Sequence, residues 1–183
     1  MNIILITDIF GVTPALLTLS QALKANTIVD PYQGQQLAFE NEADAYAYFS
    51  ENVGLDAYLA QLKKVVSITP AKSTLIGFSI GATTLWRLSE TTLANRIEQG
   101  FGFYGGQIRK YTDIKPQFDI ELVLPKSEPH FSIDELQNTL DQTQRVKMLN
   151  SNYYHGFMNI YSDNYHEGAY HQQVKRLLSI LEQ

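Results

Sequence analysis

The sequence contains no cysteine, no strong basic cluster and no long apolar run. Without cysteine, the chain can form neither a disulfide framework nor a thiolate metal site. The net charge of −5, with no basic cluster beyond Lys63-Lys64, argues against nucleic acid as a partner, because phosphate binding needs a concentrated basic surface. The first apolar run spans only about five residues before Asp8, so we expect no signal peptide, no membrane partner and a cytoplasmic location.

Internal repeats, low-complexity tracts and linkers are also absent from the sequence. Its 183 residues, of which 44% are hydrophobic and 18% charged, suffice for one globular domain with a buried core. We therefore expect a single domain over residues 1–183. His130, His166 and His171 have no paired acidic ligands at metal-binding spacing, so we expect no metal site and no cofactor.

Short apolar segments alternate along the chain with longer amphipathic ones. The pattern predicts strands over residues 2–7, 27–30, 74–78, 101–104, 120–124 and 146–149. It predicts helices over residues 14–24, 42–50, 55–66, from the turn at 79 to about 90, 133–140 and 166–181. Strands separated by helices imply right-handed crossovers, so we expect an α/β fold with a mainly parallel sheet of about six strands and helices on both faces.

Three local signals indicate where helices begin or break. Thr13 followed by Pro14 combines an N-cap with a proline at the first helical position. Ser132 and Glu135 have the spacing of a capping box. Gly54 marks the bend or break between two neighbouring helices.

The pattern G-x-S-x-G places Ser79 between Gly77 and Gly81, after an apolar segment and before a potential helix. This setting of strand, sharp turn and helix is typical of a nucleophile elbow. The strained serine needs small neighbours that let the strand and the helix approach closely. The same five-residue pattern also occurs in ordinary turns, so a catalytic interpretation depends on partners elsewhere.

Partners for Ser79 are expected in the loops that follow the strands, because the carboxyl ends of parallel strands gather functional residues. Glu128 follows the fifth predicted strand and His155 follows the sixth. A serine nucleophile needs a base, and the base needs a carboxylate that holds its tautomer. In an α/β-hydrolase the chain order is serine, acid, histidine, and these three residues satisfy it.

Each partner also has an ordinary structural interpretation. His155, which follows two tyrosines, could be a partly buried loop histidine, and Glu128 could be a solvated loop charge. The other acids considered are Asp119, Asp134 and Asp163. The first precedes a strand, the second lies at a helix start and the third follows the histidine in sequence, so Glu128 is the preferred acid.

Five motifs, TDIFGVTP, DPY, GFSIGA, GFYGG and YYHGF, occur in this order over nearly the whole chain. Together they resemble the dienelactone hydrolase family. The resemblance implies an α/β-hydrolase fold with Ser79 as nucleophile, Glu128 as triad acid and His155 as base. It also implies an oxyanion hole formed by the backbone N–H groups of Ile9 and Ile80.

Three departures from the family pattern bear on function. Family members with dienelactone activity carry cysteine at the nucleophile position, whereas this chain has Ser79, which points to other esters. The family acid is usually aspartate and is Glu128 here. The chain begins at the strand that bears the oxyanion loop, so we expect the leading β-hairpin to be lacking and one sheet edge to be less protected.

The expected function is a serine hydrolase that cleaves a small carboxylic ester or related acyl compound through an acyl-serine intermediate. The partly apolar substrate site would comprise Asp8, Phe10, Tyr32, Tyr104 and Tyr154. The alternative is a catalytically weak or inactive hydrolase fold that binds a small molecule or a protein partner. Substrate identity, leaving group and oligomeric state, with a dimer as one option, stay open.

Two charged residues have open roles at this point. Asp8 could cap local backbone amides in a turn, as Asx side chains commonly do. The resemblance places it beside the nucleophile instead. Arg87 falls on the predicted helix after the elbow and could simply pack there, so no arginine is assigned to a substrate carboxylate.

Overall fold

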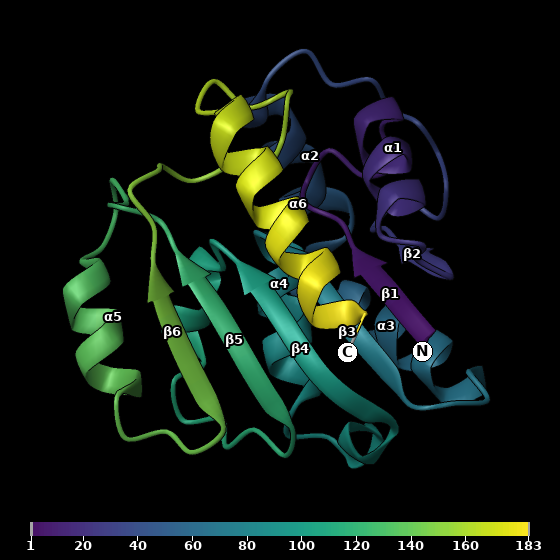
Figure 1. Ribbon diagram of the computed structural model, residues 1–183. Coiled ribbons are helices and arrows are strands. Elements are labelled where there is room, and N and C mark those ends of the chain that lie inside the picture. The colour runs from purple at the N-terminus through teal and green to yellow at the C-terminus, as the bar shows by residue number, and fades with distance from the viewer. Residues whose placement is uncertain (1, 183) are drawn as a thin grey trace.

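The computed structural model describes residues 2–182, which form a six-stranded sheet covered by helices (Figure 1). The strands are β1 (Asn2–Ile6), β2 (Thr27–Val29), β3 (Ser73–Phe78), β4 (Ile97–Phe103), β5 (Asp119–Leu124) and β6 (Val146–Asn150). The α-helices are α1 (Pro14–Ala22), α2 (Glu42–Asn52), α3 (Gly54–Ile68), α4 (Ile80–Leu88), α5 (Ile133–Leu140) and α6 (Glu167–Leu181). Two short 3₁₀ helices, η1 (Thr92–Arg96) and η2 (Gly106–Lys110), flank β4.

The strand order is β2-β1-β3-β4-β5-β6, and every neighbouring pair is parallel. The chain runs outward from β1 to β2 and then returns to place β3 on the other side of β1. Ile6 of β1 lies opposite Gly77 of β3, so the loop after β1 and the turn after β3 leave the sheet side by side. This crevice at the carboxyl ends of the strands is where open α/β sheets bind ligands.

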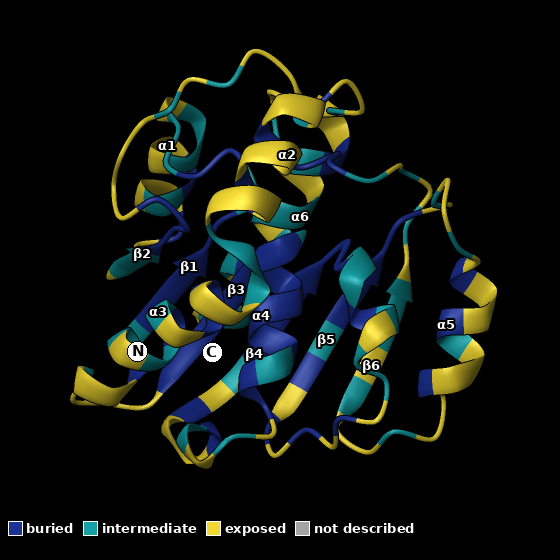
Figure 2. Cartoon of the chain, turned by 180° about the vertical axis from the view of Figure 1, so that it is seen from behind, coloured by how far each residue is buried: buried dark blue, intermediate teal, exposed yellow. Residues whose placement is uncertain are grey.

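Two layers of buried side chains hold the helices to the sheet. On one face, Leu62 of α3, Trp86 of α4 and Leu136 of α5 belong to a single apolar cluster. On the other face, Leu19 of α1 and Leu177 of α6 belong to a second cluster. Figure 2 shows buried residues along the central strands and exposed residues on the outer sides of the helices. The predicted α/β class with helices on both faces is confirmed.

The local signals read from the sequence have the expected geometry. The Thr13 side chain accepts the N–H of Leu16, which caps α1. The Ser132 side chain accepts the N–H of Glu135, which caps α5. Gly54 has a φ of 72° where α2 gives way to α3, a left-handed conformation that glycine adopts without strain.

The fourth strand begins earlier than the sequence pattern predicts. It starts at Ile97 rather than at residue 101, and its first half includes the polar residues Glu98 and Gln99. Ile97 is buried, whereas Glu98 is exposed and lies 3.8 Å from Lys72 in an ion pair. This half of the strand therefore lacks the apolar run on which the prediction relied. The 3₁₀ helices on either side were not predicted.

No helix within residues 2–182 combines the length and the apolar character needed to cross a lipid bilayer. The longest helices, α3 and α6, have 15 residues each. A transmembrane helix needs about 20 predominantly apolar residues.

Candidate active site

Ser79 lies at the sharp turn between β3 and α4. Its backbone φ of 52° and ψ of −113° are rare for a residue with a side chain. The Ser79 N–H donates a hydrogen bond of 2.9 Å to the Phe103 carbonyl at the end of β4, which ties the turn to the neighbouring strand. The strained serine is therefore held at the carboxyl edge of the sheet.

Two glycines allow the turn to be this tight. A Cβ atom on Gly77 would lie 2.7 Å from the backbone carbon and oxygen of Gly81. A Cβ atom on Gly81 would collide with the carbonyl oxygens of Ile6 and Thr7 at the end of β1. Backbone cannot move aside as the tip of a flexible side chain can, so both positions require glycine. The requirement for small neighbours around the elbow is confirmed.

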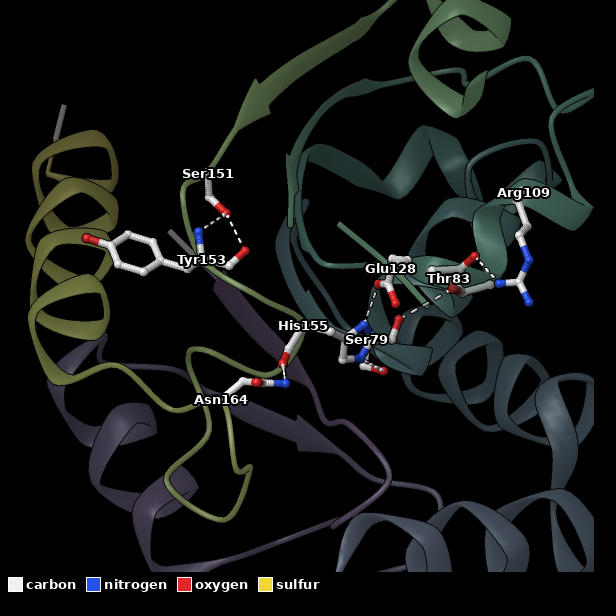
Figure 3. A network of polar contacts seen from close by, with 9 residues as sticks. Ser79, Thr83, Arg109, Glu128, Ser151, Tyr153, His155 and Asn164 are labelled. Atoms are coloured by element: carbon white, nitrogen blue, oxygen red, sulfur yellow. Dashed lines mark hydrogen bonds and ion pairs between the residues drawn. The ribbon is translucent and has the colours of Figure 1, made fainter. Parts of the chain in front are cut away.

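The structure brings the three predicted polar residues into one hydrogen-bonded chain (Figure 3). Ser79 Oγ lies 2.9 Å from Nε2 of His155, and Nδ1 of His155 lies 2.7 Å from Oε1 of Glu128. A carboxylate only accepts hydrogen bonds, so Glu128 favours a proton on Nδ1 and leaves Nε2 free to accept from the serine. This geometry matches that of a nucleophile, its base and an orienting acid.

Contacts on the loop after β6 fix the position of His155. The Asn164 side chain donates to the His155 carbonyl at 3.0 Å, as Figure 3 shows. The Tyr104 ring lies against the imidazole, with 4.9 Å between ring centroids. Gly156, with a φ of 86°, turns the chain directly after the histidine. The imidazole is therefore held through both its backbone and its ring.

The loop after β1 is held by two hydrogen bonds to a single peptide unit. Asp8 Oδ1 accepts the N–H of Phe10 at 3.0 Å, and the Tyr32 hydroxyl donates to the Ile9 carbonyl at 2.6 Å. Both bonds engage the peptide that joins Ile9 to Phe10, one at its N–H and the other at its C=O. The preceding N–H, that of Ile9, is thereby kept in a fixed orientation.

Ile9 and Ile80, the residues predicted to form an oxyanion hole, line the same cleft as Ser79. In the described part of the chain, neither backbone N–H donates a hydrogen bond to another residue. Ile80 is the first residue of α4, where N–H groups have no partner within the helix. Their role as oxyanion donors stays a prediction.

Ser79 borders two cavities. The larger is a cleft of about 510 Å³, which Glu128, His155 and Arg109 also line. The smaller has a volume of about 30 Å³. Three predicted substrate-site residues, Asp8, Phe10 and Tyr104, line this smaller cavity together with Ser79 and His155.

Two other predicted substrate-site residues lie elsewhere. Tyr32 is buried behind the β1 loop, where its hydroxyl supports Ile9 and its ring contacts Tyr48. Tyr154 is 50% exposed, and the Lys126 ammonium lies 5.8 Å from its ring centroid. Neither tyrosine lines a cavity that contains Ser79. Tyr32 supports the site from behind, while Tyr154 faces solvent.

Arg109 is a cleft residue that the sequence reasoning missed. It lies on η2, its guanidinium is 4.6 Å from the Phe131 ring centroid, and its Nη1 donates to the Gly106 carbonyl. The arginine that the sequence did single out, Arg87, pairs instead with Asp56 at 2.7 Å. Arg109 follows the GFYGG motif closely, so the rule that places functional residues beyond strand ends applied to it as well.

Asp8 combines both roles that the sequence left open. It accepts a local backbone N–H, as an Asx turn does, and it lines the small cavity beside Ser79. Burial raises the pKa of the Asp8 carboxyl, although its hydrogen bonds from the Phe10 backbone and the Asn159 side chain oppose this effect. The protonated form is therefore favoured by folding.

Within residues 2–182, no cluster of three or more histidine, cysteine, aspartate or glutamate side chains is arranged to hold a metal ion. In the cleft, Glu128 is instead hydrogen-bonded to His155.

No protein-family model matches the sequence. A relative from Bacillus subtilis, the uncharacterized protein YczH, is 24% identical over 165 residues, which cover 86% of this chain and 80% of that protein.

Solved structures resemble this one over nearly its whole length. A candidate dienelactone hydrolase from Klebsiella pneumoniae superposes with a TM-score of 0.75 and 17% identity, covering 99% of this chain and 86% of that one. Dienelactone hydrolase from Anabaena variabilis gives a TM-score of 0.69 and 10% identity, covering 98% and 84%. The chain has the fold of the dienelactone hydrolases. At these identities the similarity establishes architecture alone, since one fold hosts many activities.

The raised pKa of Asp8 leads to a testable dependence of stability on pH. Because the pKa of Asp8 is higher in the native protein than in the unfolded chain, protonated Asp8 stabilises the fold. This stabilisation is fully present below pH 3.8, the ordinary pKa, and is lost as the pH rises through the raised pKa of the native protein. The asparagine side chain of the Asp8→Asn variant cannot ionise. The free energy of unfolding of this variant, measured relative to that of the wild type, should therefore increase between about pH 4 and pH 7. Urea unfolding at several pH values measures this difference.

Asp163→Asn is the matched control, because Asp163 is an exposed loop aspartate outside both cavities that contain Ser79. The difference in free energy of unfolding between Asp163→Asn and the wild type should not increase with pH as it does for Asp8→Asn. Parallel stability curves for Asp8→Asn and the wild type would contradict the assignment of a raised pKa.

Proposed function

We propose that this protein is a serine hydrolase that cleaves small carboxylic esters or related acyl compounds through an acyl-serine intermediate. The observation that carries the proposal is the hydrogen-bonded chain from Ser79 through His155 to Glu128, at the carboxyl edge of the sheet. These three residues line a cleft that is large enough for a small substrate.

In the proposed acylation step, His155 Nε2 takes the hydroxyl proton while Ser79 Oγ attacks the carbonyl carbon of the ester. The carbonyl oxygen becomes an oxyanion, to which the N–H groups of Ile9 and Ile80 would donate. Glu128 stabilises the resulting imidazolium. Collapse of the tetrahedral intermediate breaks the bond to the alcohol oxygen, which receives the proton from His155.

Deacylation repeats the same chemistry with water. His155 takes a proton from the water molecule, whose oxygen attacks the acyl carbon. The second tetrahedral intermediate expels Ser79 Oγ, which recovers its proton from the imidazolium, and the carboxylic acid leaves. No cofactor or metal is needed to balance either step.

The names of proteins with similar structures are consistent with this chemistry. They include a dienelactone hydrolase-like promiscuous phosphotriesterase from metagenomic libraries, with a TM-score of 0.65 and 13% identity. They also include Est1E from Butyrivibrio proteoclasticus, with a TM-score of 0.64 and 9% identity. Ser79 in place of a cysteine nucleophile favours ordinary esters over dienelactones as substrates.

Removal of either proton-transfer partner should abolish most of the activity. With 4-nitrophenyl acetate as substrate, Ser79→Ala and His155→Ala should each lower kcat by on the order of 10⁴-fold or more, because such a triad works as a unit. Glu128→Gln should cost less than either, since it orients the base without exchanging a proton. Steady-state kinetics on purified variants measure these effects.

Ser127→Ala is the matched control, because this exposed serine is next to Glu128 and should be dispensable. Wild-type activity in Ser79→Ala would show that the hydrolysis comes from another site or from a contaminant.

The Tyr32 hydroxyl should contribute to the rate without touching substrate. Tyr32→Phe removes the donor that holds the Ile9 carbonyl, so the Ile9 N–H should lose its fixed direction toward the oxyanion. We expect kcat to fall roughly tenfold, less than when an oxyanion donor itself is removed, with KM changed less than about twofold. Steady-state kinetics separate the two constants.

Tyr48→Phe serves as its control, because the Tyr48 ring lies 5.7 Å from that of Tyr32 and is unconnected to the Ile9 carbonyl. If both variants lose the same activity, or if Tyr32→Phe raises KM alone, the hydroxyl does not position the oxyanion loop.

A further inference from the structure

Helices α1 and α6 cover the same face of the sheet (Figure 1). A further cavity, of about 280 Å³, lies on this face. Apolar side chains form most of its wall. They come from α1, from the end of β3 and from the loop that precedes α6, and include Leu16, Leu19, Phe78, Met158 and Ile160. The triad as described above makes no use of this space.

The cavity lies one layer of side chains away from the nucleophile. Asp8, Tyr104 and Asn159 line it, and the same three residues line the small cavity that contains Ser79 and His155. The Asn159 side-chain amide donates to Asp8 Oδ2 at 2.6 Å. Asp8, Tyr104 and Asn159 thus form a partition between the two cavities, and two of its side chains are hydrogen-bonded to each other. A group attached to Ser79 therefore needs only to pass this partition to enter the apolar space.

The lining suits an uncharged group. It includes no lysine, arginine or histidine, so an anionic ligand would find no counter-charge. Both carboxylate oxygens of Asp8 already accept hydrogen bonds, from Phe10 and Asn159. The Tyr104 hydroxyl is fully buried and has no hydrogen bond of good geometry, although the Met158 backbone lies close to it. Burial raises the pKa of this hydroxyl, so it stays neutral.

The volume sets the size of the group. An apolar cavity of roughly 150 Å³ admits benzene, so 280 Å³ corresponds to roughly ten non-hydrogen atoms at the same density. A medium-length alkyl chain or a single substituted ring fits this limit.

The cleft that Ser79 lines and the cavity beyond the partition differ in their charged side chains. The 510 Å³ cleft is lined by several charged or titratable side chains, Arg109, Glu128 and His130 among them, whereas the lining of the 280 Å³ cavity includes one acidic residue, Asp8, and no basic one. His155 must protonate the leaving alcohol, and it lines the cleft with the charged side chains but not the apolar cavity. The alcohol therefore belongs in the cleft, which leaves the apolar cavity for the other half of an ester.

We propose that the apolar cavity holds the acyl group of the substrate, so that the preferred esters carry an uncharged acyl group of about six to ten non-hydrogen atoms. This inference rests on the proposed hydrolase function. It adds the class of acyl group, and it assigns the acyl group to the apolar cavity and the alcohol to the cleft.

The test compares 4-nitrophenyl acetate, butyrate, hexanoate and dodecanoate, which share one leaving group. For the wild type, kcat/KM should rise roughly fourfold per methylene up to hexanoate and fall for dodecanoate, which exceeds the cavity. Ala15→Phe projects a ring from α1 into the cavity. It should lower kcat/KM for hexanoate at least tenfold while the value for acetate stays within about twofold.

Ala22→Phe is the matched control, since it places the same ring on an exposed position of α1 outside the cavity lining. It should leave the chain-length preference unchanged. Equal losses for acetate and hexanoate in Ala15→Phe, or no rise from acetate to hexanoate in the wild type, overturn the acyl assignment while the hydrolase function stands. No hydrolysis of any ester by folded protein would refute the hydrolase function and the assignment with it.

A measurement that does not depend on turnover uses the methionines. In protein labelled with ¹³C at the methionine methyl groups, toluene should shift the resonance of Met158, which lines the cavity. The resonance of Met148, which packs on the opposite sheet face, is the internal control and should not move. An unmoved Met158 resonance at saturating toluene would show that the cavity does not admit an apolar group.

Discussion

The close approach of α4 to the ends of β1 and β3 is the constraint on which the site depends. Gly77 and Gly81 make it possible, because a side chain at either position would meet backbone atoms. The same approach holds Ser79 in its strained conformation and brings its neighbour Ile80, at the start of the helix, next to the loop that carries Ile9. The positions of the proposed nucleophile and of the proposed oxyanion donors therefore follow from one packing arrangement.

Around this constraint, loops supply the chemistry while the sheet and helices supply the rigidity. Glu128 and His155 come from the loops after β5 and β6. Glu128 forms a backbone bridge with Phe131, and Asn164 donates to the His155 carbonyl, so both loops are held by further contacts. Tyr32, after β2, extends the same principle because its hydroxyl holds the β1 loop from behind. Ser79 lines the cleft that carries charged side chains, whereas Asp8, Tyr104 and Asn159 separate the serine from the apolar cavity.

The sequence predicted the fold and the three polar residues, because strand ends converge in a parallel sheet and the chain order of the triad is fixed. It did not predict which aromatic rings line the site. Tyr32 and Tyr154 both follow strands, but the direction of a side chain in a loop depends on tertiary contacts that sequence spacing does not encode. The sequence did not indicate Arg109 as a cleft residue, because the short 3₁₀ helix that carries it has no periodic pattern of apolar residues. The apolar cavity arises from packing between α1 and the loop before α6, which are far apart in sequence.

If Ser79 is an activated nucleophile, as proposed, it should form a covalent adduct that can be located in the chain. The protein is treated with a fluorophosphonate, digested and mapped by mass spectrometry. We expect one adduct per chain, located on Ser79, and its loss when His155 is replaced by alanine, because the serine then has no base. An unmodified Ser79 in folded protein, or an adduct on another serine, would contradict it.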